Sequence, residues 1–270
     1  MTVVDTTPPR LPLRETAARR TGGLSPMLSR LAAERATGAL EREHGVLYLA
    51  EGQVVHAESP PAPGLDVLLS AHGTLSAETW PEVLARADDR CGAARLLLDA
   101  GRIGRGPLEL CHTGVLYDAG YFALAPSRTP GRFRYGDRHP LGTLRPVSVA
   151  ALERETLRRR ALLHRLWPEG RLDSAPLLRT VAGTGVVPPA RRWAVLELVD
   201  GVRTAPEIAR ALGRHTFHTL VDVRRLAAAG LVAAGAPPPE AGPPADPSPP
   251  PATDPDITLL KRLRDALEAL

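Results

Sequence analysis

The chain has 270 residues and a formal net charge of +4, which leaves room for one domain with its own core and a second, smaller domain. The charge is too small for a histone-like tail, and two cysteines, Cys91 and Cys111, exclude a disulfide framework or a four-cysteine zinc site. No apolar run reaches membrane-spanning length, and residues 1–24 lack the apolar core of a signal peptide, so we expect a cytoplasmic protein without membrane contacts. We expect both cysteines to be small buried apolar residues.

Proline and glycine divide the chain into six segments. These are a disordered arm (1–25), a first domain (26–166), a connector (167–188), a three-helix module (189–235), a proline-rich linker (236–253) and a C-terminal helix (254–270). The linker contains two runs of three prolines, which favour an extended polyproline II conformation over a packed core.

The first domain is predicted to begin with a helix over 26–35 and to continue as a β-meander. Glycine in each two-residue turn between β-rich runs is a strong hairpin signal. The predicted strands are 38–43, 46–50 and 53–58, with a closing strand over 132–135. His56 falls in an alternating strand pattern, so we expect a half-buried, hydrogen-bonded side chain.

Helices are predicted for the rest of this domain. Two similar runs end in glycine turns at Gly73 and Gly101, and a further helix is expected around 115–124. A long amphipathic helix over 147–166 follows. It places Leu152, Leu163 and Leu166 on one side and Arg154, Arg158 and Arg165 on another, and we expect the arginines to form a solvated face.

The three-helix module has the clearest punctuation in the chain. Thr204 and Glu207 form a capping-box pattern at a helix start, and Gly213 and Gly230 stand where helices end in a left-handed residue. This pattern resembles a winged-helix or helix-turn-helix module, whose third helix would be the reading element.

On that third helix, apolar residues are expected to take the core positions, and basic residues remain for contact with DNA phosphates. The core set is Phe217, Leu220, Val223 and Leu226, and the candidate DNA-binding set is Arg214, His218, Arg224 and Arg225. Two features weaken the DNA interpretation. Asp222 is placed to neutralise part of this face, and the exit after Leu231 leaves no room for a two-stranded wing.

The meander also resembles a known family. The run from Thr37 to Leu40, the strand Gly45 to Leu49 and the strand Glu51 to Ala57 are similar to the PATAN domain, the N-terminal regulatory module of cyanobacterial PatA-like response regulators. The run 131–135 is similar to that domain's closing strand. The resemblance covers residues 26–140, and its combination with a winged-helix-like module is typical of actinobacterial regulators. It implies signalling through protein contacts near Ras-like GTPases and roadblock proteins, and it implies no catalytic residues.

Signals for catalysis or metal binding are weak. The only lysine is Lys261, so no P-loop lysine is present, and no Gly-x-Ser-x-Gly hydrolase motif occurs. We expect the glycine-rich run 101–106 to be a loop. His215 and His218 have the spacing of two metal ligands on one helical face, but without a third ligand we expect a solvated helix start. We therefore expect no catalytic residue, no cofactor and no metal ion.

The C-terminal segment is predicted to be an amphipathic helix. Asp254 and Pro255 suit the start of a helix, and apolar residues then recur at three- and four-residue steps. The apolar stripe consists of Ile257, Leu260, Leu263, Leu267 and Leu270. A free stripe on a proline-rich tether is typical of a docking motif for a partner, a second copy of the chain or the first domain. The alternative is a frayed tail.

Taken together, the sequence predicts an α+β protein: a small antiparallel meander with helices, a three-helix winged-helix-like domain and a short C-terminal helix. The preferred interpretation is a non-enzymatic transcriptional regulator that binds DNA. The alternative is an adaptor that contacts a roadblock-like protein or a small GTPase without binding DNA. Formation of a homodimer is left open.

Overall fold

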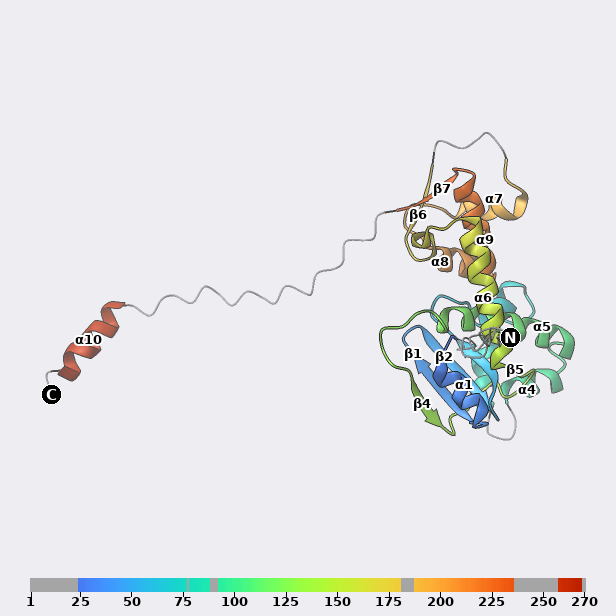
Figure 1. Cartoon of the computed structure of the whole chain (residues 1–270), viewed down its shortest axis with the longest axis horizontal. Coiled ribbons are helices and arrows are strands. Elements are labelled where there is room, and N and C mark those ends of the chain that lie inside the picture. Colours follow the sequence, from blue (N-terminus) through green and yellow to red (C-terminus); the bar gives the residue numbers. More distant parts are fainter. Residues whose placement is uncertain (1–23, 77, 88–91, 181–186, 236–256, 269–270) are drawn as a thin grey trace, which may run out of the picture. The chain divides into compact units, whose positions relative to one another are not determined.

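The computed structural model describes residues 24–76, 78–87, 92–180, 187–235 and 257–268. Contacts group the chain into one unit within residues 1–235 and a second within residues 236–270, which holds helix α10 (Ile257–Glu268) (Figure 1). The mixed helix and strand content confirms the predicted α+β class. The predicted arm, the proline-rich linker and the predicted helix cap at Asp254 and Pro255 lie outside the described residues.

The predicted β-meander forms the centre of an antiparallel sheet. Its strands are β1 (Gly38–Arg42), β2 (Gly45–Ala50) and β3 (Gln53–Glu58), with β4 (Arg132–Tyr135) beside β1 and β5 (Val147–Ser148) beside β3. The strand order is therefore β4-β1-β2-β3-β5. Strand β5 was not predicted, because its two residues are too short to give an alternating pattern.

The turn between β2 and β3 shows why glycine is needed there. Glu51 and Gly52 both have positive φ, 48° and 78°, as the favoured two-residue hairpin turn requires. A Cβ atom on Gly52 would lie 2.5 Å from the carbonyl oxygen of Ala32, in helix α1 (Pro26–Ala33). The glycine thus allows this end of the hairpin to lie against α1.

Helix α5 (Arg105–Ala123) packs against β2 and β3 and is much longer than the predicted 115–124. Gly106 lies inside it, so the expectation that 101–106 is entirely a loop is wrong. Glycine and proline in the first turn lower helix propensity and conceal this start. Gly120 has a packing role, since a Cβ there would lie 2.7 Å from Leu152 Cδ1 of helix α6 (Val149–Leu166).

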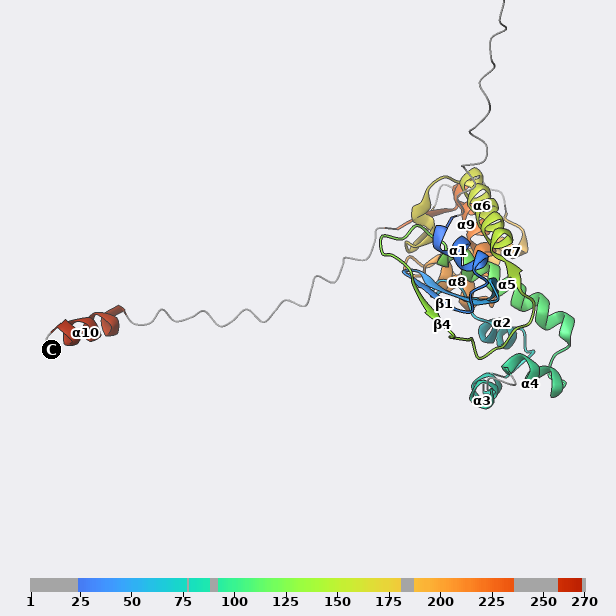
Figure 2. The same cartoon turned by 60° about the horizontal axis from the view of Figure 1, so that its bottom comes forward.

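Three short helices gather around the first half of α5 (Figure 2). They are α2 (Leu65–Ala71), α3 (Thr79–Arg86) and α4 (Ala93–Asp99). Gly73 and Gly101 have φ of 67° and 63° just beyond α2 and α4, which confirms the two predicted glycine turns.

Helix α6 runs from the first domain to the three-helix module (Figure 1). Leu152 lies in the core of the first domain, whereas Leu163 lies in the core of the module. Arg154, Arg158 and Arg165 are exposed, as predicted. The two parts therefore share one helix, and they pack together rather than being separated by a flexible connector.

The module consists of α7 (Ala190–Glu197), α8 (Ala205–Ala211) and α9 (Thr216–Ala228), followed by strand β7 (Val232–Ala234). Glu207 Oε2 accepts the backbone N–H of Thr204 at 2.8 Å, and Gly213 and Gly230 have φ of 58° and 68°, so the predicted capping box and helix ends are confirmed.

As predicted, the described residues after Leu231 form one strand rather than a two-stranded wing. Strand β7 pairs antiparallel with β6 (Leu177–Arg179), which comes from the segment predicted as a connector. The same segment contributes the 3-10 helix η1 (Gly170–Asp173), whose Leu172 enters the module's core. No helix among the described residues is long and apolar enough to cross a membrane.

Helix α5 offers a matched test of core packing. Leu116 is fully buried, whereas Leu110 on the same helix is 77% exposed. We expect Leu116→Ala to lower the free energy of unfolding by about 3 kcal/mol, because it removes buried methyl groups and leaves a cavity. Leu110→Ala should change it by less than about 0.5 kcal/mol. Urea denaturation followed by tryptophan fluorescence measures both, and equal effects would contradict this account of the core.

Candidate functional site

The start of α9, the predicted reading helix, is buried against the first domain. Asp118 of α5 is fully buried, and its two carboxylate oxygens accept the backbone N–H groups of Thr216 at 2.7 Å and Phe217 at 2.9 Å. These N–H groups belong to the first turn of α9, which has no acceptor within the helix. A carboxylate from the first domain therefore caps α9.

Arg159 of α6 completes this contact. Its Nη1 lies 3.7 Å from Asp118 Oδ1, and its guanidinium lies 4.5 Å from the centre of the Phe217 ring. Burial raises the pKa of Asp118, while the two backbone hydrogen bonds and Arg159 oppose that rise. Gly114 of α5 leaves room for His215 in the turn before α9, because a Cβ atom on residue 114 would lie 2.5 Å from His215 Nε2. Three helices thus meet at one carboxylate.

The structure separates the four candidate DNA-binding residues. His218 and Arg225 are exposed, and Arg214 is half-buried, where its Nη1 donates to the carbonyl oxygen of Arg191 at 3.2 Å. Arg224 is only 4% exposed. The expectation that Arg224 is free on the surface is therefore wrong.

Arg224 is held by partners inside the module. Its Nη2 donates to both carboxylate oxygens of Asp173 at 2.7 Å, and its Nη1 donates to the carbonyl oxygens of Leu163 and Trp167. Asp222 is also buried and pairs with Arg191 of α7 at 2.9 Å. The expectation that Asp222 neutralises part of the exposed face of α9 is therefore wrong. The four predicted core residues of α9 are buried.

A second polar cluster lies beside β3. His56 is 5% exposed, so the expectation that it is half-buried is wrong and the side chain is buried. Its Nδ1 lies 3.1 Å from Nε2 of His112, a fully buried residue of α5, and its ring stacks on His139 with centroids 3.8 Å apart. Burial lowers the pKa of His112 to about 4 and that of His56 well below 6.5. The neutral pair can then share one hydrogen bond.

Glu58 anchors the other end of this cluster. Its Oε2 accepts the Tyr48 hydroxyl at 3.2 Å, and its Oε1 lies 3.0 Å from His139 Nε2. His139 Nδ1 accepts the backbone N–H of Leu141 at 3.1 Å, so His139 in its neutral form carries its proton on Nε2 and donates it to Glu58. The hydrogen bond from His139 lowers the pKa of Glu58 despite its partial burial.

These residues do not fit a metal ion as they are arranged. One donor atom each of His56, Glu58 and His139 lies within 4.8 Å of the others. However, the lone pairs of imidazole lie in the ring plane, and the two rings are stacked at an interplanar angle of 24°. One ion at about 2.1 Å from both nitrogens cannot lie in both planes. His139 Nδ1 also accepts a hydrogen bond, whereas a metal-binding histidine usually donates with its second nitrogen.

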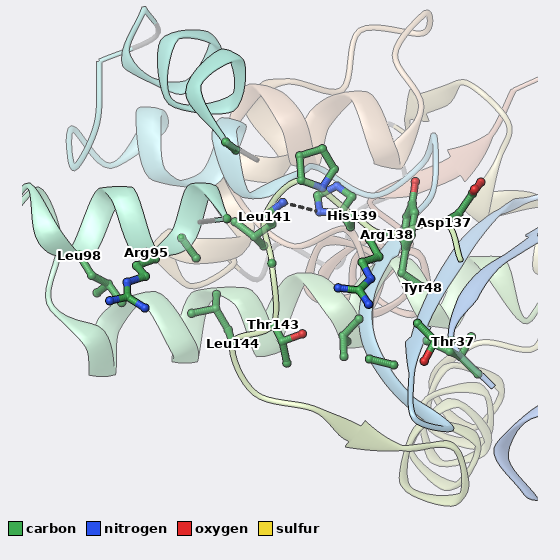
Figure 3. Close-up of a pocket in the computed structure, with 18 of the residues that line it drawn as sticks. Thr37, Tyr48, Arg95, Leu98, Asp137, Arg138, His139, Leu141, Thr143 and Leu144 are labelled. Carbon is green, nitrogen blue, oxygen red and sulfur yellow. Dashed lines mark hydrogen bonds between the residues drawn. The ribbon is translucent and has the colours of Figure 1, made fainter. Parts of the chain in front are cut away.

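A cavity of about 920 Å³ opens beside Tyr48 and His139 (Figure 3). Its described lining includes three arginines and three carboxylates, so the charges balance and favour no ligand charge. The arginines are Arg95, Arg105 and Arg138, and the acidic residues are Glu51, Asp99 and Asp137.

Cys111 lies elsewhere and is partly buried, and burial raises the pKa of its thiol, which disfavours the reactive thiolate. Cys91 lies outside the described residues.

Comparisons with protein-family models, with curated proteins and with solved structures find no match for this chain. The PATAN and winged-helix resemblances therefore stay predictions. The residues that matter most in the two polar sites, Asp118 and His112, were not predicted. Their one signal is a charged or polar residue within an otherwise apolar helical stretch, and that signal names no partner.

The capping carboxylate gives a direct test. We expect Asp118→Ala to lower the free energy of unfolding by about 3 kcal/mol, because it leaves two helix N–H groups without their buried acceptor and removes the negative charge beside Arg159. Asp118→Asn retains one acceptor oxygen and should cost less. The control is Asp137→Ala, which removes an exposed ion pair with Arg134 worth less than about 1 kcal/mol. Chemical denaturation measures all three, and a small loss for Asp118→Ala would contradict the capping role.

The buried histidines predict acid sensitivity. The pKa of His112 is about 4 in the folded chain and 6.5 when unperturbed, so the unfolded chain binds more protons between these values. The free energy of unfolding should therefore fall as the pH is lowered from about 6.5 to about 4. His112→Gln should flatten this slope, although His56 and His215, whose pKa values are also lowered by burial, keep part of it.

The control for this experiment is His164→Gln, which changes an exposed histidine on α6. It should leave the slope as in the wild type. Denaturation curves at several pH values measure the effect. If His112→Gln and His164→Gln give the same slope as the wild type, His112 does not titrate as described.

Proposed function

We propose that this chain is a non-enzymatic signalling adaptor that acts through protein contacts rather than by reading DNA. The observation that carries the proposal is the capping of α9 by Asp118. In helix-turn-helix proteins, the N-terminal residues of the reading helix contact base edges in the major groove. Here Thr216, Phe217 and Thr219 are buried, so the corresponding end of α9 faces the first domain.

The remaining surface of α9 offers few phosphate contacts. Nine of its 13 residues are buried, and His218 and Arg225 are the exposed members of the predicted DNA-binding set on this helix. Non-specific DNA affinity grows with the number of phosphates neutralised by basic residues. Two isolated side chains, one of them a histidine, supply little of that affinity, and this favours the adaptor over the transcriptional regulator.

The form of the molecule also suits an adaptor. The first domain and the module share α6, and a second unit carries the amphipathic helix α10. In α10, Leu267 is 70% exposed. The side chains of Ile257, Leu260 and Leu263, and Leu270 as a whole, lie outside the described residues. We propose that the stripe formed by these five residues docks on a partner, and the PATAN resemblance favours a roadblock-like protein or a Ras-like GTPase.

The test compares the two functions with purified components. We expect no DNA-fragment binding by fluorescence anisotropy, even at low salt, and measurable binding to a roadblock-like protein or Ras-like GTPase encoded in the same genome. Deleting residues 254–270 should abolish that binding while leaving the melting temperature of the remaining chain nearly unchanged. Salt-dependent DNA binding that Arg225→Ala weakens would instead support a transcriptional regulator. Binding to neither class would overturn the adaptor proposal.

A further inference from the structure

A second cavity, of about 780 Å³, lies where the module meets the first domain. Leu68 and Leu69 of α2 and Ile103 of the turn before α5 supply apolar lining. Arg191 of α7 and Arg214 of the α8–α9 turn lie at the same cavity from the side of the module. Its size is within the usual range for small-molecule sites, and its walls come from both parts of the unit.

The charge around this cavity is one-sided. Its described lining contains two arginines and no carboxylate, unlike the cavity beside His139. Arg191 is partly neutralised, because its Nε lies 2.9 Å from the buried Asp222 behind it. Arg214 donates to a backbone carbonyl and has no carboxylate partner among the described residues. Within the described part of the chain, Arg214 is therefore the arginine of this lining whose charge no carboxylate balances.

Three imidazoles add polarity to the same lining: His72, His215 and His218. His72 Nδ1 lies 2.8 Å from the carbonyl oxygen of Leu68, which leaves its Nε2 free for another partner. Burial lowers the pKa of His215 to about 4, so this ring is neutral at pH 7, and its Nδ1 lies 4.0 Å from Asp118. The two arginines thus supply positive charge to this lining, which suits a ligand with one negative charge.

We propose that this cavity binds a small amphipathic carboxylate, with its carboxylate group at Arg214 and Arg191 and its hydrocarbon part against Leu68, Leu69 and Ile103. Guanidinium groups bind carboxylates through paired, charge-assisted hydrogen bonds. A wholly polar anion such as phosphate would leave the apolar wall without a partner, and a neutral hydrocarbon would leave Arg214 unpaired. The cavity would bind this ligand in an adaptor and in a DNA-binding regulator alike.

Binding at this position has a mechanical consequence. The ligand would contact α2 and α5 of the first domain together with α7 and the α8–α9 turn of the module. It would therefore stabilise the contact between the two parts, and the folded state as a whole, in proportion to its concentration above its dissociation constant.

The test uses octanoate as the probe and the full chain as the protein. We expect octanoate at up to about 5 mM to raise the melting temperature and to bind with a dissociation constant measurable by calorimetry. The matched compounds are 1-octanol, octylamine and inorganic phosphate. Each should bind at least about tenfold more weakly, since each lacks either the negative charge or the hydrocarbon part.

Variants separate this cavity from the rest of the surface. Arg214→Gln should weaken octanoate binding by about tenfold or more. Thr74→Trp, at an exposed position of the cavity lining, should block it without disturbing a buried residue. Arg138→Gln, in the cavity beside His139, is the control and should leave it within about twofold of the wild type.

Several results would overturn the proposal. One is the absence of octanoate binding, and another is equal binding of octanoate and 1-octanol or octylamine. Phosphate binding as tight as octanoate binding would make the site a plain anion site. Retention of octanoate binding in both Arg214→Gln and Thr74→Trp would place it elsewhere. The DNA and GTPase measurements are independent of these results, so either proposal can fail alone.

Discussion

The architecture of this chain depends on one buried carboxylate at the start of a helix. Asp118 lies in the second half of α5, yet its oxygens accept hydrogen bonds from the first turn of α9. Burying a carboxylate is costly unless hydrogen-bond donors and a positive charge surround it, and here the α9 N–H groups and Arg159 do so. The first domain and the module therefore satisfy each other's polar groups. If the first domain and the module were separated, apolar residues such as Phe217 would be exposed to water.

Local structure was largely predictable from the sequence, and long-range contacts were not. The Glu51-Gly52 turn, the Thr204 capping box and the terminal glycines Gly213 and Gly230 act within a few residues, so their patterns identify the meander and the three helices. By contrast, Asp118 and Thr216 are 98 positions apart, and His139 and Glu58 are 81 apart. No spacing rule connects such residues. The first half of α5 escaped prediction for a local reason, because Gly106 and Pro107 weaken the helical signal where tertiary packing supplies the stability.

Three arginines near the junction of the two parts act as internal hydrogen-bond donors. Arg224 binds a carboxylate and two backbone carbonyls, Arg159 binds Asp118, Glu155 and the carbonyl oxygen of Tyr117, and Arg160 donates to the carbonyl oxygen of Leu124. The guanidinium group presents five N–H donors in one plane, so it can satisfy several carbonyl groups at helix ends at once. Arg159 and Arg224 are consequently buried and do not contribute to the surface that a nucleic acid would meet.

The pairing of β6 with β7 has a consequence for how this protein could have arisen by recombination. The three helices look like a portable cassette in the sequence, but their last strand pairs with residues that precede the first helix. Transfer of residues 189–235 into another gene would leave β7 with an unpaired edge and Arg224 without Asp173. The smallest segment that could move between genes with its sheet and its buried ion pair intact therefore begins before η1, within what the sequence presents as a connector.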